Sequence, residues 1–175
     1  MKTCSKPSPL RHRRRQAGFT LVELIAVITV LGVVTATAVP RLTALGGEAR
    51  YAALRAAGGA LMTVAITSHG GFMINGRPAQ ALEDVTVPLV NGYPVAGPAT
   101  ADAARLRANF TVYTAVAAPT ATTPGVTAGS MAIVPNDLAG TPRAATCYLV
   151  YTESPAPNSP PTVTAGPDAN ADNCA

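Results

Sequence analysis

Residues 18–39 read GFTLVELIAVITVLGVVTATAV, and this stretch decides the fold of the N-terminal part of the chain. From Phe19 to Val39 the run is apolar and contains one charge, the carboxylate of Glu23. A helix over this run is about 31 Å long at ~1.5 Å per residue, which matches one bilayer core. A charge at bilayer depth costs at least ~2.5–3.5 kcal/mol. The sequence therefore predicts a function in which Glu23 finds a partner.

The basic character of the chain belongs to the segment before this run. The formal net charge is +4, but six of the 13 Lys and Arg residues precede Phe19. Without residues 1–18, 7 basic and 9 acidic residues remain and the net charge is −2. The basic cluster at 11–15 predicts a cytoplasmic N-terminus by the positive-inside rule. It does not indicate nucleic-acid binding, so no specific nucleic-acid partner is expected.

Two ordinary membrane signals also fit the hydropathy. A secretory signal has a basic start and an apolar run, and the small residues at 35–38 mimic a cleavage site. This run is too long for a typical secretory signal, although that alternative stays open. A plain signal anchor fits as well. Neither alternative explains why Glu23 lies inside the run.

The junction Gly18-Phe19-Thr20-Leu21-Val22-Glu23-Leu24 resembles the cleavage and methylation signature of type IV prepilins and pseudopilins. The resemblance implies that a prepilin peptidase cleaves between Gly18 and Phe19 and N-methylates the new terminal Phe19. It also implies that Glu23 pairs with the terminal amine of a neighbouring subunit during assembly. Such pairing would offset the cost of burying both charges. A Glu that snorkels to the membrane interface is the structural alternative.

Gly32 and Pro40 are the expected positions of a helix kink. Proline removes a main-chain hydrogen bond and kinks or breaks a helix. The pilin resemblance implies a helix that loosens between such residues in a filament, while a simple kink at the membrane exit is an equal alternative. The expected organisation is a leader over 1–18, an assembly helix over 19–39 and a globular head over 40–175.

The residues that follow keep helical spacing. Over 48–68 an apolar stripe recurs at intervals of three and four residues and predicts a helix that packs against a sheet. Its members are Tyr51, Leu54, Gly58, Leu61 and Ala65, and the opposite face carries Glu48, Arg50 and Arg55. We expect one helix from 19 to about 68, bent near Pro40 and stopped by the glycines after His69.

The remainder predicts a small antiparallel sheet. Residues 72–100 contain many turn signals and indicate a looped connector with a short extended run at 85–90. A short helix is expected at 101–109. Strands are expected at 110–116, 131–134, 147–152 and 162–165. A helix followed by several strands gives an α+β fold.

Cys147 and Cys174 are the two cysteines that remain after leader removal. An even pair in an exported domain favours one disulfide, with two free thiols as the alternative. The pilin resemblance also implies a C-terminal loop closed by this disulfide, behind a long helix and a small antiparallel sheet. Residues 91–94 and 147–153 look most like pilins of the mannose-sensitive haemagglutinin (MSHA) type.

The sequence lacks a recognisable catalytic or cofactor motif, so we expect neither an enzyme nor a cofactor. His69 is the single histidine after leader removal, and its neighbouring glycines indicate a helix-end residue. Asp168, Asn170 and Asp172 alternate like the first ligands of a calcium loop. The glycine and distal glutamate of such a loop are missing, so a turn-rich tail is the preferred interpretation.

The resulting hypothesis is a structural subunit of an MSHA-like type IV pilus that supports adhesion and surface attachment. Its expected partners are other copies of itself, the prepilin peptidase, the pilus assembly platform and inner-membrane lipid. The precursor is expected in the inner membrane and the assembled subunit in an extracellular pilus. Alternatives are a type II secretion pseudopilin, a minor pilin, or a signal-anchored binding domain that does not polymerise.

Overall fold

The computed structural model describes residues 19–157 and 159–175. The predicted leader, including Gly18, lies outside the described residues. The chain divides between Val39 and Pro40 into two units.

Helix α1 runs from Leu21 to Asn75 and is helical on both sides of Pro40. The predicted end near 68 was wrong, because the helix continues through the glycines after His69. It ends where Gly76 adopts a left-handed conformation (φ 63°) and donates its N–H to the Phe72 carbonyl at 2.7 Å. Glycine is the residue best suited to this helix-ending conformation. The bend expected near Pro40 stays a prediction.

Gly71, the second glycine after His69, lies in close contact with another part of the chain and does not end the helix. A Cβ on Gly71 would lie 2.6 Å from Oε1 of Gln80, so a larger residue there would displace the Gln80 side chain. Gln80 is buried and hydrogen bonds with Asn75 at the last turn of the helix. A close approach of this kind explains a glycine at position 71, whereas Gly70 has open space around the position of a Cβ.

A three-stranded antiparallel sheet replaces most of the expected looped connector. Its strands are β1 (Ala79–Leu82), β2 (Val85–Val90) and β3 (Tyr93–Pro94), in the order β1-β2-β3. The extended run at 85–90 is thus confirmed, whereas the connector prediction for its neighbours was wrong. The turn between β2 and β3 is Asn91-Gly92, with φ 53° and 84°, as hairpin turns of this composition require.

Helix α2 spans Pro98–Ala103 and is earlier and shorter than the helix expected at 101–109. Proline at its start is favourable, because the first helical N–H has no partner within a helix. The chain leaves the helix at Arg105, which takes a left-handed conformation with φ 56°.

The second sheet contains four antiparallel strands in the order β4-β5-β6-β7. They are β4 (Phe110–Thr114), β5 (Ser130–Pro135), β6 (Leu149–Thr152) and β7 (Thr162–Ala165). The four strand predictions are confirmed within a few residues. Each strand is followed in the sheet by the next one in the chain, so the sheet is a simple meander.

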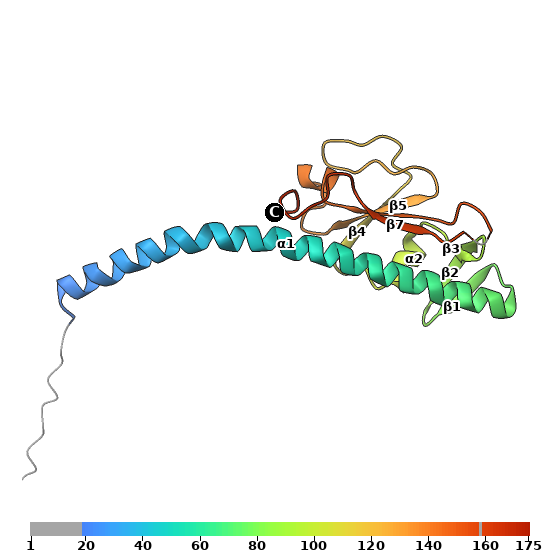
Figure 1. Cartoon of the computed structure of the whole chain (residues 1–175), viewed down its shortest axis with the longest axis horizontal. Helices are drawn as coiled ribbons and strands as arrows, with labels where there is room; N and C mark the ends of the chain where they lie inside the picture. The colour runs from blue at the N-terminus through green and yellow to red at the C-terminus, as the bar shows by residue number, and fades with distance from the viewer. Residues whose placement is uncertain (1–18, 158) are drawn as a thin grey trace, which may run out of the picture. The chain divides into compact units, whose positions relative to one another are not determined.

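The head has its core between this sheet and the second half of α1, which runs along the sheet in Figure 1. The predicted apolar stripe is confirmed, since Leu54, Leu61 and Ala65 are fully or almost fully buried. From the sheet, Ile133 and Tyr151 are completely buried in the same core. The observed class is α+β, as expected.

Candidate functional site

The first turn of α1 is capped by Thr20. The Thr20 hydroxyl accepts the N–H of Glu23 at 3.2 Å, and the Thr20 carbonyl accepts the N–H of Leu24 at 3.2 Å. Thr-x-x-Glu is the pattern of a capping box, in which the first residue of the pattern binds the N–H of the fourth. An acidic side chain in a first turn is also stabilised by the positive end of the helix dipole. The cap therefore holds Glu23 in the first turn of the helix, four residues after Phe19.

The N-terminal part of α1 exposes its apolar side chains. Phe19 is 89% exposed, and Leu21, Val22 and Val33 are about 70% exposed. This helix is long and apolar enough to cross a membrane, judged by length and composition. Exposed aliphatic surface of this extent requires lipid or other protein to cover it.

Three threonines in this segment have their hydroxyls satisfied within the helix. Thr29 donates to the Ala26 carbonyl at 2.9 Å, and Thr35 donates to the Leu31 carbonyl at 2.7 Å. Thr37 donates to the Val34 carbonyl at 3.0 Å. Such back-bonding removes the cost of placing a hydroxyl in an apolar environment. Glu23 is then the charge that needs a partner when this segment is covered.

The structure places the predicted kink residues in the helix without testing their role. Gly32 has open space around the position of a Cβ, so packing within the chain does not require glycine there. Pro40 is helical. The proposed role of both residues in a filament therefore stays a prediction.

At the other end of the chain, Cys147 and Cys174 form the expected disulfide. Their Cα atoms are 5.1 Å apart, and both residues are fully buried in the head core. The bond closes a loop over a sequence separation of 27 that includes β6 and β7. The interpretation of two free thiols is excluded by this geometry.

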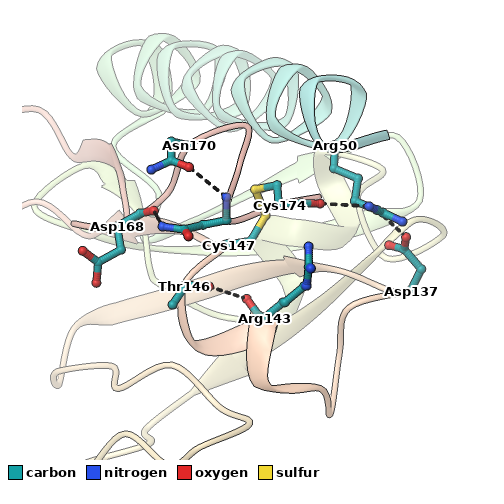
Figure 2. The surroundings of a disulfide bond; sticks show 9 residues. Arg50, Asp137, Arg143, Thr146, Cys147, Asp168, Asn170 and Cys174 are labelled. Carbon is teal, nitrogen blue, oxygen red and sulfur yellow. Dashed lines mark hydrogen bonds and ion pairs between the residues drawn. A yellow bond between two sulfur atoms is a disulfide. The ribbon is translucent and has the colours of Figure 1, made fainter. Parts of the chain in front are cut away.

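Arg50 connects the disulfide loop to α1. Its Nη1 donates to the Cys174 carbonyl at 2.9 Å, and its Nε donates to Oδ2 of Asp137 at 2.6 Å. Figure 2 shows the guanidinium between these two acceptors, next to the disulfide. The sequence placed Arg50 on the face opposite the apolar stripe, and the half-buried side chain reaches from there to both acceptors. We call these contacts the Arg50 bridge.

Gly47 lies one turn before Arg50 and makes the closest approach between α1 and the C-terminal turn. A Cβ there would overlap the carbonyl oxygen of Ala171 and lie 2.8 Å from the Cα of Ala175. The Gly-Gly pair at 46–47 was the sequence signal for this contact, since glycine admits another backbone. The partner, however, is more than a hundred residues away and not apparent from the sequence.

The calcium candidates are part of a hydrogen-bonded turn. Oδ1 of Asn170 accepts the Asn173 N–H at 2.8 Å, and the Asp168 carbonyl accepts from Nδ2 of Asn173 at 2.6 Å. The carbonyl of Asp172 accepts the Ala175 N–H. In the described part of the chain, His, Cys, Asp and Glu side chains form no cluster of three suited to a metal ion. The observed turn explains the Asx-rich sequence without a ligand.

Residues 91–94 contact strand β6 and the residues that follow it. The buried Tyr151 hydroxyl donates to the Pro94 carbonyl at 2.7 Å, and Nδ2 of Asn91 donates to the Ser154 carbonyl at 3.0 Å. Burial, reinforced by the charge of Glu153, raises the pKa of Tyr151 above its ordinary value. The phenol therefore stays protonated and fixes the turn between β2 and β3 against β6.

His69 lies beside this turn and packs against it. Its ring stacks on Tyr93 with centroids 4.1 Å apart, and Nδ1 is 3.1 Å from the Gly92 carbonyl. Because a carbonyl only accepts, this contact assigns the proton to Nδ1. The prediction that His69 lies at the helix end was wrong by six residues, since α1 continues to Asn75.

Comparison with known families finds a match to the prokaryotic N-terminal methylation motif over residues 13–39. The match supports a relationship to type IV pilin-like or pseudopilin proteins, which are structural proteins rather than enzymes. The motif implies processing by a prepilin peptidase and fits a membrane-anchored precursor. No curated protein and no solved structure matches the chain.

Proposed function

We propose that this chain is the precursor of a structural subunit in an MSHA-like type IV pilus. The peptidase cleaves between Gly18 and Phe19 and methylates Phe19, leaving 19–39 as an assembly helix and 40–175 as the head. The mature subunit waits in the inner membrane and then joins an extracellular filament that supports surface attachment. Its partners are other copies of the chain, the peptidase and the assembly platform.

The exposed apolar helix segment with Glu23 in its first turn is the observation that carries this proposal. Cleavage after Gly18 creates a cationic amine at Phe19. In a bundle of assembled helices, that amine of one copy neutralises Glu23 of another. The loss of one partner of a buried ion pair costs about 3–5 kcal/mol, so the pair would favour assembled over mismatched copies. The remaining aliphatic surface exchanges lipid contacts for contacts with neighbouring helices.

The head supports the MSHA-like part of the proposal through the contact between residues 91–94 and β6. Both stretches that carry the resemblance are joined by the hydrogen bond from Tyr151 to Pro94. The closed C-terminal loop adds a second feature that pilin heads share with this chain. Both features belong to one packed unit.

Filament yield from a Glu23→Ala variant tests the proposal. We expect normal leader removal and at least a tenfold loss of sheared surface filaments, because each buried amine would lack its partner. Glu48→Ala is the matched control, since Glu48 is an exposed carboxylate on the same helix and its loss should leave the yield unchanged. A normal filament yield from Glu23→Ala would refute the assembly role. Filaments that appear only inside the cell envelope, with loss of protein secretion in a deletion strain, would indicate a pseudopilin instead.

A further inference from the structure

Strand β7 is an edge of the four-stranded sheet, and its pairing with β6 defines which way its backbone groups face. The N–H of Gly166 donates to the Tyr148 carbonyl at 2.9 Å, which makes these two residues a hydrogen-bonded pair. Hydrogen-bonded and non-hydrogen-bonded pairs alternate along an antiparallel ladder. Thr162 and Thr164 therefore direct their backbone groups toward β6, whereas Val163 and Ala165 direct theirs away from the sheet.

The outward backbone groups of Val163 and Ala165 have no hydrogen-bond partner among the residues that the structure describes. Thr162–Ala165 contains neither a charged residue nor a proline, so within these four residues the outward backbone groups of β7 are not blocked by either. Two N–H donors and two carbonyl acceptors thus face outward from one short strand.

A groove lies beside this edge, between β7 and α1. It has a volume of about 320 Å³ and is lined by Tyr51, Arg55, Gly58, Gly59, Met62, Leu149, Val163 and Ala165. Gly58 contacts the inner face of the sheet, because a Cβ there would lie 3.0 Å from Cγ1 of Val163. Gly59 faces open space. The inward-facing Ala165 is nevertheless exposed, so the sheet extends beyond the area that α1 covers.

The groove contains one cation without a partner. Arg55 is exposed and makes no hydrogen bond or ion pair with another residue in the described ranges. The other residues that line the groove are uncharged. A ligand that fills this groove is therefore complemented best by one carboxylate near Arg55 and by small or apolar side chains elsewhere.

We propose that the groove binds an extended, acidic peptide segment of a partner protein by strand addition to β7. The peptide backbone pairs with the outward groups of Val163 and Ala165 and becomes a fifth strand of the sheet. Alternate side chains of the peptide enter the space beside Gly59 and Met62, and a carboxylate of the peptide binds Arg55. This activity does not depend on polymerisation, so its test is separate from that of the pilus assignment.

A labelled peptide of alternating Thr and Val with one Glu tests the proposal on the full chain in detergent, by fluorescence anisotropy. We expect saturable binding. Methylation of alternate backbone amides of the peptide, one set at a time, removes the hydrogen-bond donors on one edge or the other. One set should weaken binding at least tenfold, and the other should have little effect. Equal binding by both methylated peptides and the parent would overturn strand addition.

Variants of β7 test the same backbone hydrogen bonds between the chain and the peptide. Ala165→Pro removes an outward N–H that has no role in the ladder, and proline is tolerated at such edge positions. It should weaken binding at least tenfold, whereas Thr164→Val, on the same strand, should bind normally. Persistence of binding in Ala165→Pro would overturn the proposal.

The charge is tested by a double-mutant cycle. Arg55→Gln should weaken binding of the Glu peptide by about two- to fivefold, as for an exposed ion pair, and leave binding of a Gln peptide unchanged. Equal effects on both peptides would show that Arg55 does not bind the carboxylate of the peptide, which contradicts the proposed acidic ligand. The chain could also self-associate in a way that the peptide does not reverse and that Ala165→Pro abolishes. That result would assign the groove to a second copy and overturn the proposal.

Discussion

Replacement of Gly47 by alanine should destabilise the head, although alanine is the better helix former. A glycine-to-alanine change inside a helix normally stabilises by about 1 kcal/mol. At this position the new methyl group overlaps the Ala171 carbonyl oxygen. The methyl group is fixed to the helix and the oxygen is part of the backbone, so no flexible side chain can move to relieve the overlap. The C-terminal turn must therefore move away from α1.

The cost follows from the contacts that this movement breaks. Overpacking at a tight contact costs about 1–3 kcal/mol. Displacement of the turn also weakens the hydrogen bond from Arg50 to the Cys174 carbonyl, and bonds of this charged type contribute about 1.5–3 kcal/mol. After subtraction of the helix-propensity gain, we expect Gly47→Ala to destabilise the head by about 1.5–5 kcal/mol.

Gly59→Ala is the matched control, because this glycine lies in the same helix with open space around it. It should stabilise the head by about 0.5–1 kcal/mol. Differential scanning calorimetry of the full chain in detergent measures both variants. The rate of disulfide reduction by dithiothreitol under native conditions gives a local readout, which should increase only for Gly47→Ala. A Gly47→Ala protein as stable as Gly59→Ala would refute the docking of the C-terminal turn on α1.

Further predictions concern the disulfide, a buried tyrosine and a strained turn. Double replacement of Cys147 and Cys174 by serine should lower the unfolding free energy by about 3–4 kcal/mol, from the chain entropy of the closed loop, as measured by urea denaturation. Burial raises the pKa of Tyr151 in the folded state, so stability is intact below about pH 10 and falls as pH rises above it. Tyr151→Phe should flatten this alkaline loss in a pH series of melting temperatures; an unchanged slope would contradict it. Arg105→Gly should raise the melting temperature, because the exposed ion pairs of Arg105 contribute little and glycine suits its left-handed conformation. A lower melting temperature would show that those ion pairs stabilise the fold by more than the left-handed conformation of Arg105 costs.

The sequence predicted the features that local pattern determines. The apolar run with Glu23, the helical stripe through Leu54 and Leu61, and the four strands of the larger sheet all follow from hydrophobic periodicity. Cysteine pairing followed from counting, since Cys147 and Cys174 were the remaining even pair. These signals require no knowledge of the tertiary structure.

The features that the sequence missed depend on distant contacts. The glycines at 70–71 resemble a helix stop, but the partner of Gly71 is the side chain of Gln80 across a turn. Strand β3 has only two residues, and β1 (Ala-Gln-Ala-Leu) contains no β-branched or aromatic residue, so neither carries a local strand signal and pairing with β2 defines both. Nothing near Arg50 in the sequence indicates its two partners, because Asp137 and Cys174 lie 87 and 124 residues further along the chain.

The N-terminus of the mature protein tests the central claim most directly. Intact-mass and fragment mass spectrometry of the chain purified from its native membrane should show a sequence that begins at Phe19, with one methyl group on the terminal nitrogen. Mutation of Gly18 should prevent this processing. A chain that retains its leader, or one cleaved near Ala38, would contradict the proposal that this protein is a prepilin.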